Sequence, residues 1–208
     1  MKPVIVINMK TYHQKKWVIK IAKIIEKIDK DVIIGVQPTD IYEISKKTKL
    51  QVYSQHVDYF YPGRNTGFIL PESIKENGAV GTFLNHSEHR LNFETIKKTV
   101  ARCKKLKLKT LVFSKDLNEA KKIEKLKPDY IVIEPPQLIA GKISVSEAKP
   151  DLIKKTSEFL KSKFLVGAGI HSRKDIERSV ELGAVGVAFS SIITTSKNPE
   201  KKIRELLK

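Results

Sequence analysis

The feature that most constrains the fold is a regular alternation between two kinds of segment. Short apolar runs rich in Val and Ile are each followed by a longer segment with apolar residues on one face, and this unit occurs eight times. The apolar runs, which we expect to form strands, lie at residues 3–8, 32–37, 50–55, 79–84, 109–113, 129–133, 163–167 and 184–189. The longer segments, which we expect to form helices, lie at residues 14–29, 39–48, 71–77, 92–107, 116–126, 149–161, 172–182 and 198–207.

This unbroken alternation predicts an α/β protein with parallel strands. Strands that are buried on both faces read as continuous apolar runs, as these do, because helices cover a parallel sheet. An open, doubly wound sheet could also hold eight strands, but no glycine-rich dinucleotide fingerprint follows the first strand. Eight units in 208 residues favour a closed (β/α)8 barrel, with eight parallel strands ringed by eight helices, in one domain spanning residues 1–208.

The formal net charge of +17 raises the question of a nucleic-acid partner. The lysines, however, are spread over the expected helices rather than gathered in one arm. The stretch KKWVIKIAKIIEKIDK at residues 15–30 shows the pattern, with Ile and Val on one face and Lys on the other. We therefore expect a solvated surface and no nucleic-acid partner, while the positive field would favour a phosphorylated small molecule.

Several classes of protein are disfavoured by what the sequence lacks. No run approaches the roughly 18 apolar residues of a membrane span, and the apolar stretch in MKPVIVINMK is too short for a signal peptide. Cys103 is the only cysteine, so no intramolecular disulfide forms, and we expect a cytoplasmic protein without membrane contact. His13, His56 and His171 lack metal-ligand spacing, so we expect no metal and no organic cofactor.

The stretch VIEPPQLIAGK at residues 132–142 ends an apolar run on a carboxylate. Pro135 and Pro136 lack a backbone donor and fix their own φ, so the chain leaves regular structure directly after Glu134. Taken alone, Glu134 would be read as a solvated loop residue. The barrel changes this expectation, because the active sites of such barrels lie at the C-terminal ends of the strands.

Other strands are followed by stretches with chemical character. These are NMK at 8–10, NHSEHR at 85–90, GAGI at 167–170 and SSII at 190–193. Lys10 and His86 should therefore meet Glu134 at one mouth of the barrel, beside two turns of small residues. A lysine that merely extends into water is the structural alternative for Lys10.

With these stretches in hand, the whole chain resembles the triosephosphate isomerase family, and its archaeal branch in particular. NMK is similar to the family's Asn-x-Lys motif, NHSEHR to its Asn-His-Ser-Glu block, and EPPQLIAGK to the Glu-Pro hinge of its mobile lid. The stretches SQHVD at 54–58 and GAVGTFLNHSE at 78–88 strengthen the archaeal match.

The resemblance implies an activity in glycolysis and gluconeogenesis and a role for each motif residue. Glu134 would be the base that moves a proton between C1 and C2 of dihydroxyacetone phosphate and glyceraldehyde 3-phosphate through an enediolate. His86 would be the neutral electrophile, and we expect backbone N–H groups beside it to disfavour the imidazolium. Lys10 would stabilise negative charge, Asn8 would help to position the substrate, and Glu88 would anchor Lys10.

The resemblance also assigns the phosphate-binding residues. Phosphate would be bound by Ile139 and Ala140 in the lid, Gly169 after the seventh strand, and Ser190 and Ser191 after the eighth, mainly through backbone donors.

The chain is expected to form a homodimer or homotetramer. The irregular stretch at 59–70 would interlock with a neighbouring subunit, and its Thr66 would approach the partner's Asn8 and the partner's Lys10.

The chain departs from the family pattern at several positions near the expected site, among them Gln137, His89 and Ile192. Ala140, Gly141 and Lys142 stand where the lid usually ends in Gly-Thr-Gly, and Phe113 stands where a Cys is common. We expect Phe113 to press on Glu134 and to raise its pKa. Two alternatives stay open: another sugar-phosphate enzyme on the same barrel, and a non-catalytic basic barrel that binds anions or RNA.

Overall fold

The strands form a closed parallel barrel in the computed structural model, which describes residues 2–138 and 143–208. Each strand pairs with the next in the chain, and β1 pairs with both β2 and β8, so the sheet has no free edge. The strands are β1 (Val4–Asn8), β2 (Ile33–Val36), β3 (Gln51–Ser54), β4 (Gly81–Leu84), β5 (Lys109–Ser114), β6 (Tyr130–Ile133), β7 (Phe164–Gly167) and β8 (Gly186–Phe189). The predicted (β/α)8 barrel is confirmed.

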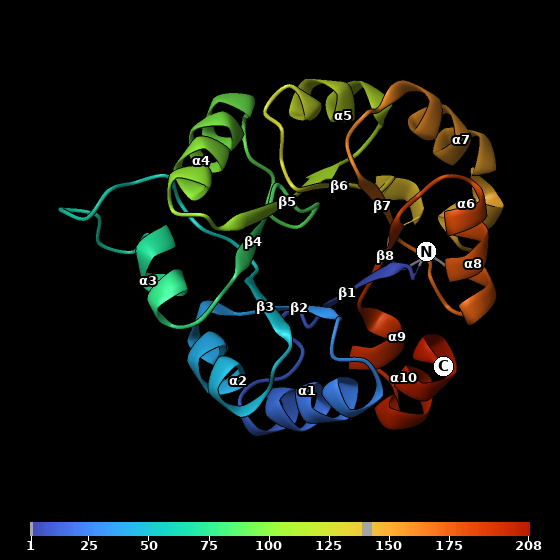
Figure 1. Ribbon diagram of the computed structural model, residues 1–208, viewed down its shortest axis with the longest axis horizontal. Coiled ribbons are helices and arrows are strands. Elements are labelled where there is room, and N and C mark those ends of the chain that lie inside the picture. Colours follow the sequence, from blue (N-terminus) through green and yellow to red (C-terminus); the bar gives the residue numbers. More distant parts are fainter. Residues whose placement is uncertain (1, 139–142) are drawn as a thin grey trace.

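The helices ring the barrel, as the end-on view in Figure 1 shows. They are α1 (Lys16–Ile28), α2 (Ile41–Lys47), α3 (Pro71–Glu76), α4 (Phe93–Lys105), α5 (Leu117–Glu124), α6 (Val145–Ala148), α7 (Pro150–Phe159), α8 (Arg173–Glu181), α9 (Ser191–Thr194) and α10 (Pro199–Leu207), with 3-10 turns at Pro38–Asp40 and Pro136–Leu138.

Two of these helices were not expected. The four-residue α6 is capped by Ser144, whose side chain accepts a hydrogen bond from the Glu147 N–H, and Pro150 then starts α7. The four-residue α9 directly follows β8, in a stretch rich in β-branched residues that does not have helical periodicity. The sequence pattern missed both because single turns are set by caps and tertiary contacts.

Two apolar layers explain why the strand segments have no polar face. Along β5, Leu111 and Phe113 point into the barrel, whereas Val112 between them packs in the outer layer beneath the helices. Gly35 on β2 makes room for the inner layer, because a Cβ there would lie 2.0 Å from the ring of Phe83. The barrel interior is thus a packed core, and the open end above it is where a site can form.

The segment at residues 59–70, between β3 and α3, extends away from the ring of helices on the left of Figure 1. Its Tyr61 and Phe68 are more than half exposed, at 58% and 51%. Arg102 on α4 lies over the ring of Tyr61 at 3.9 Å and pairs with Glu72 on α3. We call this segment the arm; Arg102 ties its base to two helices.

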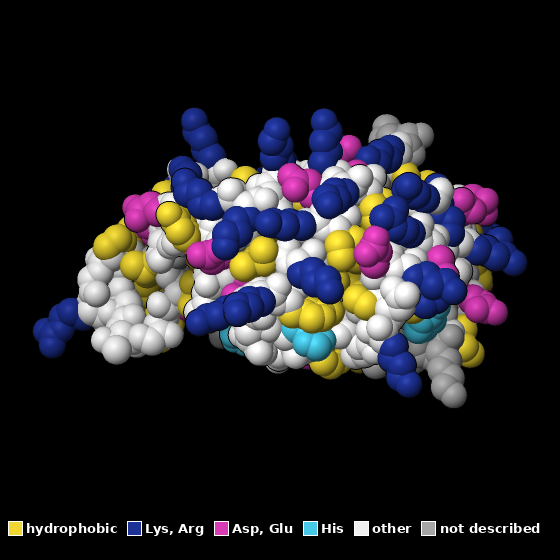
Figure 2. All heavy atoms as spheres, turned by 90° about the horizontal axis from the view of Figure 1, so that it is seen from below, with side chains coloured by type: hydrophobic (Ala, Val, Ile, Leu, Met, Phe, Trp, Pro, Cys, Tyr) yellow, Lys and Arg dark blue, Asp and Glu magenta, His cyan; other side chains and the backbone are white. Residues whose placement is uncertain are grey.

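The surface carries its positive charge in a dispersed form. On the face drawn in Figure 2, Lys and Arg side chains stand out over most of the surface, with Asp and Glu between them. Within residues 2–138 and 143–208, no helix combines the length and the apolar character that a membrane span requires.

Candidate active site

The C-terminal ends of the strands bring distant residues to one cavity of about 60 Å³. Its lining includes seven of the residues expected from the sequence, namely Asn8, Lys10, His86, Glu134, Gly169, Ser190 and Ser191. Glu88 lies just outside, where it contacts Lys10 and His86. Thr66 lies exposed on the arm, and Ile139 and Ala140 fall outside the described residues.

Glu134 is held at the rim by the last hydrogen bond of the β6 pairing. Its N–H donates to the Ser114 carbonyl at 2.8 Å, and the two prolines that follow end the ladder. Its side chain is only 11% exposed, and its Oε2 lies 3.6 Å from Nε2 of His86. Within the described part of the chain, this buried oxygen has no hydrogen-bond partner, so the carboxylate is available to a ligand.

His86 is held in the neutral form with its proton directed at the cavity. The Glu88 N–H donates to Nδ1 of His86 at 3.2 Å, across a turn rather than a helix, so Nδ1 is the acceptor and Nε2 carries the proton. Burial lowers the pKa of His86, and Lys10 and Arg90 lower it further, while Glu134 and Glu88 oppose the shift. The backbone donor expected beside the imidazole is therefore present.

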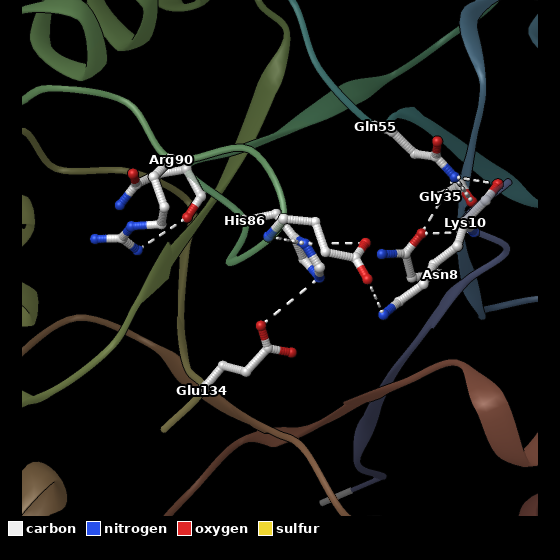
Figure 3. Close-up of polar contacts among 9 residues, drawn as sticks. Asn8, Lys10, Gly35, Gln55, His86, Arg90 and Glu134 are labelled. Atoms are coloured by element: carbon white, nitrogen blue, oxygen red, sulfur yellow. Dashed lines mark hydrogen bonds and ion pairs between the residues drawn. The ribbon is translucent and has the colours of Figure 1, made fainter. Parts of the chain in front are cut away.

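Lys10 supplies a half-buried ammonium group at the mouth. Its Nζ lies 2.7 Å from Oε1 of Glu88, and its side chain is 16% exposed against 58% for that of Glu88. Lys10 has a left-handed φ of 49°, which costs about 1–2 kcal/mol in a residue with a Cβ. Its N–H donates to Oδ1 of Asn8 at 3.0 Å. Lys10 is thus fixed over the cavity, as Figure 3 shows, rather than extended freely into water.

Gln55, just after β3, is a positioning residue that our sequence analysis did not single out. Its Nε2 donates to Oδ1 of Asn8 at 3.2 Å and to the carbonyl of Lys10 at 3.0 Å (Figure 3). The sequence held a signal for it, because Gln55 is the last residue of an expected strand and so belongs to the same rim.

A second support that the sequence did not reveal lies under His86. Asn85 adopts a left-handed φ of 61°, and its side chain donates to the Phe113 carbonyl at 2.9 Å while accepting from the Leu91 N–H at 2.9 Å. Arg90 donates to the Asn85 carbonyl at 3.1 Å and pairs with Glu119 on α5. The loop that carries His86 is thereby tied to the next unit of the barrel, through both β5 and α5.

The opposite side of the cavity is built from the turns after β7 and β8. Gly169 lines the cavity with a φ of 67°, and no side chain fits at this position because a Cβ there would lie 2.3 Å from the Ile143 carbonyl oxygen. The buried Oγ of Ser190 has no partner within the described ranges. Small residues and free polar atoms of this kind suit a small anion.

Within residues 2–138 and 143–208, no group of three or more His, Cys, Asp or Glu side chains is arranged to hold a metal ion. The cavity lining includes a carboxylate, an imidazole and an ammonium group, from Glu134, His86 and Lys10.

Fold and site together define a (β/α)8-barrel protein with a small cavity at the C-terminal mouth that carboxylate, imidazole and ammonium groups line. The family model described as triosephosphate isomerase matches residues 3–204, and the chain belongs to the triosephosphate isomerase family. Two relatives, each named triosephosphate isomerase, come from the archaea Methanocaldococcus jannaschii and Sulfolobus acidocaldarius. The first is 41% identical, with 98% of each chain covered; the second is 39% identical, with 99% of this chain and 94% of the relative covered.

The fold is also that of a solved structure. The crystal structure of triosephosphate isomerase from Bartonella henselae superposes with a TM-score of 0.74, covering 98% of this chain and 99% of that one. At 17% sequence identity this likeness supports the barrel alone.

Proposed function

We propose that the protein interconverts D-glyceraldehyde 3-phosphate and dihydroxyacetone phosphate, with Glu134 as the base, His86 as the electrophile and Lys10 as the electrostatic stabiliser. Family membership supports the activity. The observation that carries the residue roles is the 3.6 Å separation between Oε2 of Glu134 and Nε2 of His86 on a cavity that Lys10 also lines. A base and a hydrogen-bond donor so placed can act on a C–H bond and on the adjacent carbonyl oxygen of one small substrate.

The proton transfer follows from this arrangement. Glu134 takes a proton from the carbon beside the carbonyl, the C–H electrons form the C=C bond of an enediolate, and the carbonyl oxygen becomes negative. The hydroxyl proton on the neighbouring oxygen then moves to this oxygen, and the same carboxyl returns its proton to the other carbon, so that the C=C electrons form the new C–H bond and the deprotonated oxygen becomes the new carbonyl. Because Oε2 has no competing partner among the described residues, it is free to accept this proton.

His86 and Lys10 stabilise the charge that develops on the substrate oxygens. The Nε2–H of a neutral His86 donates a hydrogen bond to the oxygen, since the Glu88 N–H already occupies Nδ1. The Lys10 ammonium adds a positive charge that Glu88 already holds in place, and Asn8 fixes the Lys10 backbone, so little reorganisation is needed when the oxyanion forms.

The phosphate group would bind on the side of Gly169, Ser190 and Ser191, whose small residues leave backbone donors accessible. The lid residues Ile139 and Ala140 would complete this site and exclude water when the lid closes.

The protein is proposed to work in the cytoplasm as a homodimer or homotetramer. Exposed Tyr61 and Phe68 on the arm support an interface, because aromatic side chains are enriched in such surfaces. The arm carries Thr66 and would reach the partner subunit. Analytical ultracentrifugation of the active enzyme tests this, and a fully active monomer at assay concentration would contradict it.

The activity is tested by a coupled assay that starts from glyceraldehyde 3-phosphate. Glu134→Gln keeps the length of the side chain but removes the base, so kcat should fall by roughly 10³-fold or more. The control is Glu147→Gln, a change of an exposed glutamate on α6, which should leave kcat unaltered. No isomerisation by the parent protein, combined with turnover of another phosphosugar or with RNA binding alone, would favour the alternative functions.

A further inference from the structure

Phe113 lies beside His86 rather than only beside Glu134, as was expected. Its ring meets the imidazole edge to face, with centroids 4.6 Å apart and an interplanar angle of 77°. On its other side it meets Phe83 at 5.7 Å, and Phe83 in turn lies 6.0 Å from Tyr53. A column of aromatic rings thus runs through the barrel interior and ends on His86. The predicted effect of Phe113 on the pKa of Glu134 stays a prediction.

Phe113 also stands between two cavities. The mouth cavity of about 60 Å³ and a second cavity of about 200 Å³ share Phe113 and Glu134 in their linings. The second cavity is partly open to solvent, and its lining is largely apolar but includes Ser87 and the charged residues Arg90 and Lys115. Because this cavity opens to solvent beside two charged side chains, water can enter it, and the side chain of Phe113 is part of the wall between that water and His86.

We propose that Phe113 is a positioning residue that fixes the orientation of the His86 imidazole and seals it from the second cavity. Two contacts define the imidazole plane: the Glu88 N–H holds its Nδ1 edge, and Phe113 packs against the ring. With both in place, Nε2 is directed at the mouth cavity and Glu134 (Figure 3). Without the Phe113 side chain, the space beside the imidazole is not filled, so the imidazole can rotate about its remaining hydrogen bond to the Glu88 N–H.

The charges around His86 show what water entry would change. Lys10 faces it from the end of β1, Glu88 and Arg90 from the loop after β4, and Glu134 from the end of β6, whereas β5 presents the uncharged Phe113. Burial is the largest cause that lowers the pKa of His86, so hydrating the ring raises that pKa towards its ordinary value. An imidazolium 3.6 Å from Glu134 would pair with the carboxylate and compete for the base.

The test compares Phe113→Leu and Phe113→Ala with Phe164→Leu as the matched control. Phe164 on β7 is 3% exposed against 2% for Phe113, but it packs in the outer layer beneath the helices, away from His86. The catalytic part of the proposal rests on the proposed function. We expect kcat to fall by about tenfold in Phe113→Leu and about a hundredfold in Phe113→Ala, with KM nearly unchanged.

The readouts that separate positioning from mere stability are the pH profile and the spectrum of His86. The acid limb of kcat should move to higher pH by about one unit in Phe113→Leu, and not in Phe164→Leu. The ¹⁵N ring resonances of His86, assigned by their loss in His86→Gln, should titrate with the same shift. If Phe113→Ala does not fold, Phe113→Leu decides alone, since it retains an apolar side chain.

The outcomes distinguish failure of the inference from failure of the proposed function. An active parent enzyme whose Phe113→Leu variant matches Phe164→Leu in kcat, pH profile and His86 titration overturns the role of Phe113. A parent protein without isomerase activity overturns the proposed function, and the His86 titration then still tests whether Phe113 seals the ring.

Discussion

Shortening the proposed base by one methylene group, in Glu134→Asp, tests the geometry of the site most directly. A single carbon–carbon bond is about 1.5 Å long, so the carboxylate should retract by up to that amount. The backbone cannot follow, because the Glu134 N–H is bound to the Ser114 carbonyl at 2.8 Å and two prolines come next. The 3.6 Å separation from Nε2 of His86 therefore widens to about 5 Å.

The expected size of the effect follows from that displacement. A misplacement of about 1 Å can cost roughly a hundredfold in rate, so a retraction of about 1.5 Å should lower kcat by about 10²- to 10³-fold. At about 1.4 kcal/mol for each tenfold change, this raises the barrier by about 3–4 kcal/mol. The turns that carry Gly169, Ser190 and Ser191 lie on another part of the cavity, so phosphate affinity should change by less than about twofold.

The assay measures kcat and KM in both directions, together with inhibition by inorganic phosphate. The control is Glu147→Asp, the same change at an exposed glutamate on α6, which should behave like the parent. A loss of less than tenfold in kcat, or an equal loss of phosphate affinity, would refute the assignment of Glu134 as a base held at a defined distance.

Three further changes test the scaffold, each followed by urea unfolding. Arg102→Met should lower the unfolding free energy by about 3 kcal/mol, because it leaves the Glu72 carboxylate half-buried without its partner. Adding Glu72→Gln should recover part of this loss. If the losses of the two single variants simply add in the double variant, the two residues are not coupled. Asp175→Asn should cost about 1 kcal/mol at neutral pH, since it weakens the capping box with Ser172 at the start of α8. Burial opposes ionisation of Asp175, but hydrogen bonds from Ser172 and its neighbours leave its pKa lowered. The loss of stability in Asp175→Asn should therefore vanish as pH falls through the carboxyl range. A loss that does not depend on pH would contradict this. Ala168→Gly should stabilise the protein by up to about 1 kcal/mol, because Ala168 has a φ of 76°; destabilisation would show that the strain is offset locally.

The strand and helix pattern was predictable because the order of apolar and polar residues within each segment determines it. Each expected strand coincides with an observed one to within about two residues, since both faces of a barrel strand are buried and its apolar run is continuous. The short helices α6 and α9 were missed because they are too short to show periodicity. The residues at the mouth were predictable from the strand ends together with the family resemblance, which supplied their roles.

The chain by itself determined that a carboxylate, an imidazole and an ammonium group follow strands β6, β4 and β1, because a closed parallel barrel directs all C-terminal strand ends to one mouth. Side-chain directions depend on packing between units far apart in the chain. Only folding placed Gln55 against Asn8 and Lys10, and the ring of Phe113 against His86. No pattern within one segment encodes such contacts, because they arise where strands of different units bring their residues to the same level of the barrel.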